Sequence, residues 1–394
     1  MSPGPSAGPR ILRAAAQGLA VTAVTLLAAA ALLEIGFRLF APQPTALNVS
    51  RWDPEYGWRN EPGARGFFRT SEFRMEVRID SLGLRDDETT WAKPPGTYRI
   101  LGLGDSFAFG HGVAAESCFL SIAERRLDQR SRGRGGPRVE VLDAGVGKWS
   151  TAAEYLYFRR EGVRFSPDAA VLAFCVDNDF EDNAGQSLLR LEGGRLERVE
   201  NPEPVVRKAQ SFTRLVPGYR FLAERSHLVN FIRIRASRLD ANLAAARMKR
   251  AGERSGGSGQ GEPAWLGLRL PITRMLLDSL AAEAGRAHAR LLVLFVPGRW
   301  QCAPASERVP GKFSDPGLHA ALVDTLVAHL DSLGVPVVYP LAALREAGRS
   351  RRLYFDEGHL NEAGSRIVGD ALFDGLVAAG IAPPVPQARA GASR

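Results

Sequence analysis

Arg99-Ile-Leu-Gly-Leu-Gly-Asp-Ser106 is a short apolar run that ends in glycine and passes directly into two polar residues. A stretch with helical character follows around 116–129, and this alternation of apolar run and helix recurs toward the C-terminus. Runs of this kind, about four to eight residues long, are typical of strands that are buried on both faces of a sheet.

Four further apolar runs continue the pattern. They cover 139–142, 169–176, 290–296 and 335–338, and helices are expected at 151–161, 271–287, 316–333 and 362–379. Strands that alternate with helices are typical of a parallel sheet with helices on both faces. Over residues 98–384 the sequence therefore predicts an α/β fold, a three-layer α/β/α flavodoxin-like sandwich with a mainly parallel sheet.

Two segments depart from this alternation, and a flexible tail is expected at 385–394. Residues 184–270 contain amphipathic stretches and the linker-like Ser255-Gly-Gly-Ser-Gly-Gln-Gly261, so we interpret them as an insertion in the α/β domain. Ligands of α/β sheets bind beyond the carboxyl ends of the strands, so the insertion either forms a lid there or packs against the sheet edge. Residues 42–97 are rich in turns and aromatic residues and are interpreted as a β-rich extension.

The N-terminal region 1–41 has the composition of a membrane anchor. Ala14 to Leu33 contains no charged residue, and a helix of about 20 residues spans the hydrocarbon core of a bilayer. Arg10 and Arg13 precede the stretch, so the positive-inside rule places the N-terminus in the cytoplasm. We expect a single-pass signal-anchor in the inner membrane with a periplasmic domain; a cleaved signal peptide is the alternative.

Composition excludes several other classes of protein. With 45% hydrophobic and 24% charged residues, the 394-residue chain can bury a sizeable core. The net charge is +8, and only 5 of the 51 basic residues are lysine. No nucleic-acid-binding fold accompanies this charge, so no nucleic-acid partner is predicted. The three cysteines lie far apart, and neither a metal nor a cofactor is predicted.

Polar residues gather where predicted strands end and before the last helix. These segments are Gly104–Ser106, Asp143–Lys148, Val176–Asp179 and Asp356–His359. A serine needs a base to become a nucleophile, the base is usually a histidine oriented by a carboxylate, and the oxyanion needs hydrogen-bond donors. Ser106, His359, Asp356 and Asn178 supply these groups. Each also has a structural alternative: a helix cap for Ser106 or Asp356, a turn for Asn178, and a surface position for His359.

Together these segments resemble the SGNH (GDSL) hydrolase superfamily of membrane-anchored bacterial type, over roughly residues 98–384. The resemblance implies that Ser106 is the nucleophile, His359 the base and Asp356 the residue that orients it. The implied oxyanion donors are Ser106, Gly145, Gly147, Lys148 and Asn178.

The chain departs from the family pattern at two positions. Val176 replaces a glycine of the third block, and its side chain could crowd the site. In the second block Lys148 occupies the position of the expected glycine, so its backbone can act as a donor only if its angles suit a non-glycine residue.

The resemblance implies a serine esterase that hydrolyses an O-acyl ester, O-acetyl included, of an envelope carbohydrate or lipid. Two alternatives stay open: an O-acyltransferase that uses the same triad on an envelope polysaccharide, and a non-catalytic envelope scaffold.

Overall fold

The computed structural model describes residues 8–185, 188–199, 218–236, 266–302 and 316–383. These residues fall into two compact units, which are described separately. The described part of the first unit consists of 8–46, 69–72 and 218–236, and the remaining described residues form the second. The expected linker at 255–261 and the tail at 385–394 lie outside the described residues.

The second unit is built on a five-stranded parallel sheet in the order β12-β11-β8-β6-β7. The strands are β6 (Thr97–Gly104), β7 (Arg138–Asp143), β8 (Ala169–Cys175), β11 (Arg290–Val296) and β12 (Val337–Val338). Gly104 aligns with Ala173 in the sheet register. The strands run in one direction, so their carboxyl ends meet at one edge, as the sequence predicts.

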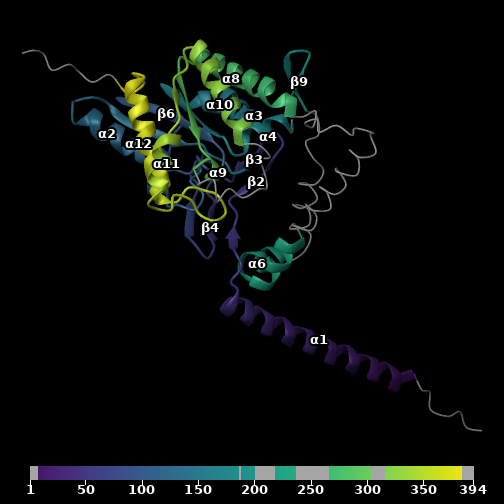
Figure 1. Ribbon diagram of the computed structural model, residues 1–394. Helices are drawn as coiled ribbons and strands as arrows, with labels where there is room; N and C mark the ends of the chain where they lie inside the picture. Colours follow the sequence, from purple (N-terminus) through teal and green to yellow (C-terminus); the bar gives the residue numbers. More distant parts are fainter. Residues whose placement is uncertain (1–7, 186–187, 200–217, 237–265, 303–315, 384–394) are drawn as a thin grey trace, which may run out of the picture. The chain divides into compact units, whose positions relative to one another are not determined.

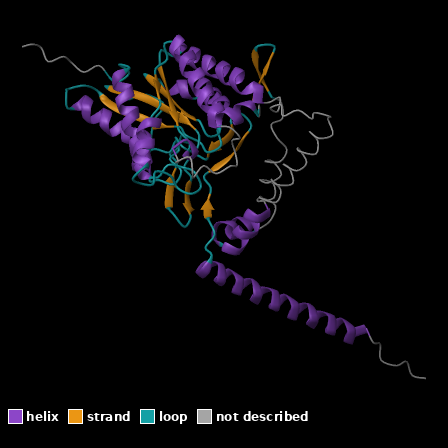
Figure 2. Ribbon diagram, in the orientation of Figure 1, coloured by secondary structure: helices purple, strands orange, loops and turns teal. Residues whose placement is uncertain are grey.

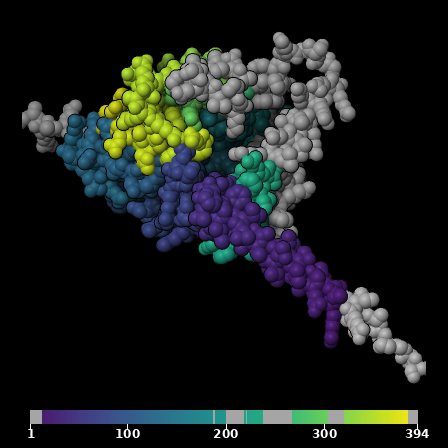
Figure 3. Space-filling view, turned by 60° about the horizontal axis from the view of Figure 1, so that its bottom comes forward, coloured from purple at the N-terminus to yellow at the C-terminus, as the bar shows by residue number. Residues whose placement is uncertain are grey.

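Helices cover both faces of this sheet (Figures 1 and 2). They are α2 (Phe119–Arg132), α3 (Thr151–Arg160), α8 (Arg269–Arg286), α10 (Pro316–Ser332), α11 (Leu341–Gly348) and α12 (Glu362–Ala378). Side chains of a strand alternate between faces, so Leu172 and Phe174 join the core formed with α3, α8 and α10. Val171 and Ala173 join the core formed with α2, α11 and α12. The predicted three-layer sandwich is confirmed; α2 and α12 lie side by side at its surface (Figure 3).

Short elements complete the second unit. They are η1 (Ala115–Ser117), η2 (Gly162–Phe165), α4 (Asp179–Ala184), η3 (Leu266–Leu268) and α9 (Arg299–Cys302). Within 184–270, β9 (Leu189–Glu192) and β10 (Arg195–Arg198) form an antiparallel hairpin. The Arg198 guanidinium at the end of this hairpin donates to the carbonyl oxygens of Pro54 and Glu55 at 2.6 Å. The hairpin therefore packs beside the upstream extension.

The upstream extension packs on the turn that follows β6. Its strands are β1 (Thr45–Leu47), β2 (Ser50–Asp53), β3 (Gly57–Asn60), β4 (Arg65–Arg69) and β5 (Arg74–Arg78). β2 pairs with β3, and β4 and β5 belong to a sheet in the order β1-β4-β5. Met75 and Val77 of β5 bury their side chains with Phe109, and buried Arg85 donates to the carbonyls of Gly110 and Val113. The extension thereby supports the segment that carries Ser106.

The first unit consists of α1 (Gly8–Phe40), α6 (Tyr219–Arg225) and a helix over 227–236. Residues Arg13–Phe40 of α1 reach a mean hydropathy of 2.1, and the most apolar part of this segment is not buried inside the protein. The helix is long and apolar enough to cross a membrane, and a signal sequence would have the same properties. Residues 219–236 were expected in an insertion of the α/β domain. They contact the C-terminal end of α1 instead, through bonds between residues almost two hundred positions apart.

Candidate active site

Ser106 lies on a tight turn at the carboxyl end of β6. The turn is closed by bonds from Phe109 N to the Asp105 carbonyl (3.0 Å) and from His111 N to the Ser106 carbonyl (2.9 Å). Glycine is required at position 104, because a Cβ there would lie 2.6 Å from the Ala108 Cβ and 3.1 Å from the Ala173 Cβ. Ser106 is partly exposed although its immediate neighbours are buried, so the turn presents its hydroxyl to solvent.

His359 reaches Ser106 from a loop 253 residues farther along the chain. Its Nε2 lies 2.8 Å from the Ser106 Oγ, as the nucleophile and base assignments require. The loop is closed by an antiparallel bridge between Tyr354 and Leu360 and by a bond from Phe355 N to the His359 carbonyl (2.8 Å). The loop ends at Asn361, which caps α12. A closed loop of this kind fixes the imidazole against the serine.

The carboxylate beside His359 belongs to Glu357, whereas the sequence predicts Asp356. Glu357 Oε2 lies 2.5 Å from His359 Nδ1, while Asp356 is largely exposed and pairs with Arg352 at 2.6 Å. A spacing of three residues would allow either a loop or a helical turn to bring Asp356 to the ring, but the loop bridged between Tyr354 and Leu360 brings Glu357 there instead. Burial raises the pKa of Glu357, but the hydrogen bond and charge of His359 outweigh it, and the net shift is downward.

Gly145 packs against the Ser106 turn, but its N–H is already used. A Cβ at this position would lie 2.3 Å from the Phe109 N, so only glycine permits this approach. Gly145 N donates to Asp143 Oδ1 at 2.8 Å, and its carbonyl accepts from Asn60 of the extension at 3.0 Å. The expected donor role of Gly145 is therefore corrected, because its N–H has an internal acceptor.

Gly147 and Lys148, farther along the same turn, are the other expected donors of this segment. Lys148 has a φ of +76°, the left-handed conformation that a glycine would favour, so its backbone does adopt the unusual angles. Its ammonium lies 4.0 Å from the centre of the Trp58 ring, and burial lowers its pKa. The N–H groups of Gly147 and Lys148 donate to no acceptor within the described part of the chain. They remain available to a ligand.

Val176 and Asn178 follow β8, where the resemblance implies an oxyanion donor at Asn178 and the Val176 side chain could crowd the site. Asn178 is the residue before α4, and its amide Nδ2 donates to Asp182 Oδ2 at 2.9 Å. In this state the amide is directed to a carboxylate. Val176 is fully buried in the core formed with α3 and α8, so its side chain does not crowd the serine.

Buried carboxyl groups lie next to the site, and composition did not single them out. Burial raises the pKa of Asp105 to about 6, partly offset by the Phe107 N–H and by His359. Glu154 on α3 is fully buried, neither of its oxygens has a partner among the described residues, and burial raises its pKa well above the ordinary value. Burial and neighbouring Glu154 raise the pKa of Asp179 likewise. The raised pKa values of Glu154 and Asp179 favour their neutral forms, whereas Asp105, with a pKa of about 6, is mostly ionised at pH 7.

His111 is a second histidine beside the serine. Its ring centre lies 4.7 Å from that of His359 and 4.8 Å from that of Phe68. Burial lowers the pKa of His111 to about 4, so the ring is neutral near pH 7. His111, Glu357 and His359 each offer a ligand atom within 4.8 Å of the others, a cluster that could hold a metal ion. The sequence predicts no such cluster, because the fold alone brings position 111 to position 359.

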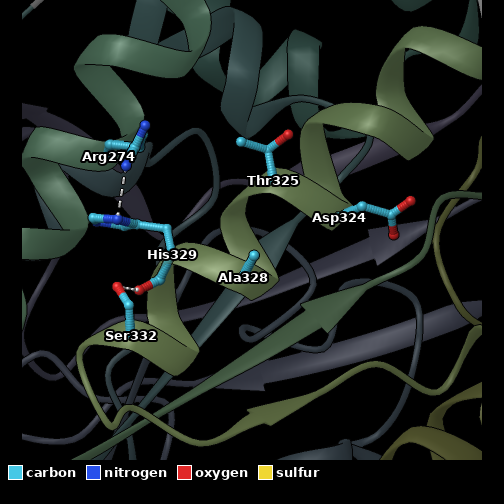
Figure 4. Close-up of a pocket in the computed structure, with 6 residues that line it drawn as sticks. All are labelled: Arg274, Asp324, Thr325, Ala328, His329 and Ser332. Atoms are coloured by element: carbon cyan, nitrogen blue, oxygen red, sulfur yellow. Dashed lines mark hydrogen bonds between the residues drawn. The ribbon is translucent and has the colours of Figure 1, made fainter.

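A second pocket lies between α8 and α10 and contains another histidine (Figure 4). It has a volume of about 550 Å³. Arg274 lies 3.1 Å from His329 Nδ1, and Asp278 lies 2.5 Å from His329 Nε2. Both ring nitrogens are therefore occupied, and Ser332 in the same pocket bonds the His329 carbonyl instead. In this pocket the imidazole of His329 is paired with Arg274 and Asp278, and Ser332 Oγ donates to a backbone carbonyl, so the histidine and the serine do not form a nucleophile–base pair.

Comparisons with known proteins found similar solved structures but no similar sequence family. The chain matches no protein-family model and none of the curated proteins. A catalytic mutant of Axe2, an acetylxylan esterase from Geobacillus stearothermophilus, is 11% identical and aligns over 72% of this chain and 94% of its own, with a TM-score of 0.38. A member of the lipolytic G-D-S-L family from Veillonella parvula is 11% identical over 70% and 97%, with a TM-score of 0.36.

A third neighbour is LAE5, an alpha/beta hydrolase from the metagenome of Lake Arreo, Spain. It is 12% identical and aligns over 72% of this chain and 95% of its own, with a TM-score of 0.40. The chemistry of this site is therefore argued from the chain's own residues.

Proposed function

We propose that the chain is a serine esterase of the SGNH (GDSL) type, with Ser106 as nucleophile, His359 as base and Glu357 as the residue that orients the base. One observation carries the proposal: a continuous hydrogen-bonded row from Glu357 Oε2 to His359 Nδ1 (2.5 Å) and from His359 Nε2 to Ser106 Oγ (2.8 Å). A serine at a strand end in this arrangement is the constellation that serine hydrolases use on several unrelated folds.

Each group has a defined step in this mechanism. His359 Nε2 takes the Ser106 proton while Oγ attacks the ester carbonyl, and the ionised Glu357 stabilises the imidazolium through Nδ1–H. The imidazolium then gives its proton to the leaving alkoxide, and an acyl-enzyme forms. Water, deprotonated by the same nitrogen, attacks the acyl carbonyl and releases the carboxylic acid and free Ser106.

The candidate oxyanion donors are the backbone N–H groups near Ser106 that have no acceptor among the described residues. Gly147 and Lys148 donate to nothing else among the described residues, and the Ser106 N–H is the third candidate. Two donors of this kind typically suffice for acyl transfer, and losing one costs about 10² to 10³ in rate. The Asn178 amide joins them when it leaves Asp182, so its contribution depends on a side-chain rotation.

The substrate that we propose is an O-acyl ester of an envelope carbohydrate or lipid, O-acetyl included. The apolar helix Arg13–Phe40 supports this placement, since it would hold the domain at the periplasmic face of the inner membrane. The triad is equally suited to transfer of the acyl group to a sugar hydroxyl. The ratio of free acid to acylated glycan, measured with an added glycan acceptor, separates hydrolysis from transfer.

The test is hydrolysis of a short-chain aryl ester by the full chain in detergent. Ser106→Ala should lower kcat/KM by about 10³ or more, because the nucleophile is lost. Ser332→Ala, in the second pocket, is the matched control and should leave the rate unchanged. Equal rates for wild type and Ser106→Ala would refute the assignment.

A further inference from the structure

His111 lies close enough to Glu357 and His359 for the three side chains to bind one metal ion together. It lies between Gly110 and Gly112, which have φ values of +68° and +94°, in the turn that follows Ser106. Its ligand atom and those of Glu357 and His359 all lie within 4.8 Å of one another. The three residues come from two segments, the turn that carries Ser106 and the bridged loop that carries Glu357 and His359.

The residue types fit a transition metal. Two imidazole nitrogens and one carboxylate oxygen are a set typical of Zn²⁺ with three protein ligands and one open position. Bonds of about 2.0–2.2 Å require ligand atoms roughly 3.3 Å apart. Binding therefore draws the His111 nitrogen inward from a separation of at most 4.8 Å and parts Glu357 Oε2 from His359 Nδ1, which are now 2.5 Å apart. We propose that His111, Glu357 and His359 form an inhibitory site for a divalent transition metal of the Zn²⁺ class.

The inhibition follows from the tautomer of His359. Glu357 contacts Nδ1, so a metal shared with Glu357 binds His359 through Nδ1 in place of the proton there. A neutral imidazole coordinated at Nδ1 carries its one proton on Nε2. That nitrogen faces Ser106 Oγ and can no longer accept a proton. The metal therefore blocks the base, and this consequence rests on the proposed esterase function.

Calorimetric titration of the full chain with Zn²⁺ tests the site without using activity. We expect one tight site in wild type and in Ser106→Ala, and binding at least about tenfold weaker in His111→Phe. His329→Phe removes a histidine from the second pocket and should leave the affinity unchanged. Equal affinity in wild type and His111→Phe, or no binding to wild type, would overturn the site.

Ester hydrolysis then tests the inhibition separately. His111→Phe should hydrolyse the ester at the wild-type rate without metal and require at least about ten times more Zn²⁺ for half-inhibition. A chelator should restore the wild-type rate. If wild type binds Zn²⁺ through His111 but hydrolyses no ester, the metal site stands and the proposed function fails.

A second inference concerns the helices at the end of α1 and rests on different contacts. Glu34, one residue after the uncharged stretch, accepts from Ser226 Oγ (2.8 Å) and from the backbone N–H groups of His227 (3.0 Å) and Leu228 (2.9 Å). It thereby caps the helix 227–236 from outside. The rings of Phe37 and Phe231 add a contact with centres 4.6 Å apart. The helix is thus fastened to the end of α1.

This helix pair exposes apolar side chains next to cations. Phe221, Leu222 and Ile232 are 60%, 46% and 57% exposed. Arg225 lies over the Phe221 ring, and Arg235 lies over the Phe231 ring. Apolar residues flanked by arginine are typical of helices that lie in the headgroup region of an anionic bilayer. Glu34 directly follows the uncharged stretch Ala14–Leu33, and Phe40 ends the candidate span, so residues 219–236 are held at the C-terminal end of that span. We infer that residues 219–236 rest on the bilayer surface.

Quenching by lipids with brominated acyl chains tests this surface. The full chain, with Cys302→Ala as background, is placed in nanodiscs with a fluorophore on Phe221→Cys or Ile232→Cys. Both labels should be quenched, and the label on exposed Leu333→Cys of the other unit should not. Unquenched labels at 221 and 232, with a quenched label on Leu26→Cys in the span, would overturn the inference. An unquenched label on Leu26→Cys would instead refute the anchor.

Discussion

Adjacent carboxylates, Asp356 and Glu357, make different contacts, and the difference predicts different effects on catalysis. Glu357→Gln should lower kcat/KM by about 10² to 10⁴, since the amide cannot hold the imidazolium or the correct tautomer. Asp356→Asn removes a surface ion pair with Arg352 and should change kcat/KM by less than about threefold. Ester hydrolysis measures both. A severe loss in Asp356→Asn with an active Glu357→Gln would restore the aspartate as the third member of the triad.

A buried aspartate beside the site makes stability depend on pH. Burial raises the pKa of Asp143 to about 8, although Arg85 and the Gly145 N–H oppose the shift. The folded pKa exceeds the unfolded value of about 3.9, so this stabilisation is complete below about pH 4 and is lost as pH rises through 8. Asp143→Asn keeps an oxygen for Gly145 and does not titrate.

Thermal unfolding of both proteins at pH 5 and pH 9 checks this prediction. The Tm of Asp143→Asn relative to wild type should rise between these pH values, because the wild type loses about 4 kcal/mol of stability that the variant keeps. The same Tm difference at both pH values would show that Asp143 is ionised throughout. The comparison isolates Asp143 because other carboxyls with raised pKa values, such as Glu124, titrate alike in both proteins.

At the scale of elements, the turn after β7 must approach the turn after β6. Gly145→Ala places a Cβ 2.3 Å from the Phe109 N and should cost about 1–3 kcal/mol of stability and displace the serine turn. Gly267→Ala, in η3, meets nothing within 4 Å and has no positive φ, so it is the control. Tm and kcat/KM should fall together in Gly145→Ala and stay near wild type in Gly267→Ala. A Gly145→Ala protein with wild-type values would show that the two turns are not tightly packed.

The apolar runs predicted the main sheet well, because period and length are local properties. All five runs became parallel strands in one sheet, although the run at 335–338 forms only the two residues of β12. The choice between Asp356 and Glu357 could not be read from the sequence, since both stand close to His359 and the loop backbone decides which one faces the ring. The closeness of His111 to Ser106 in the sequence suggested that it could line the pocket, but its contact with His359 depends on the fold.

At the scale of the whole molecule, the segment 219–236 shows the limit of a linear analysis. Its amphipathic pattern was visible, but its attachment to Glu34 and Phe37 joins parts of the chain almost two hundred residues apart. Such a contact has no local signal. The prediction of a membrane anchor, by contrast, needs only the uncharged stretch, and α1 is a long, apolar, unburied helix.

The central claim is that Ser106 is a nucleophile activated by His359 and Glu357. The most direct measurement is reaction of the full chain in detergent with a fluorophosphonate, followed by peptide mass spectrometry. We predict one covalent adduct on Ser106, lost in Ser106→Ala and formed at least about 10² times more slowly in Glu357→Gln. Failure of wild type to react, or an adduct on another serine with Ser106 unmodified, would contradict the account.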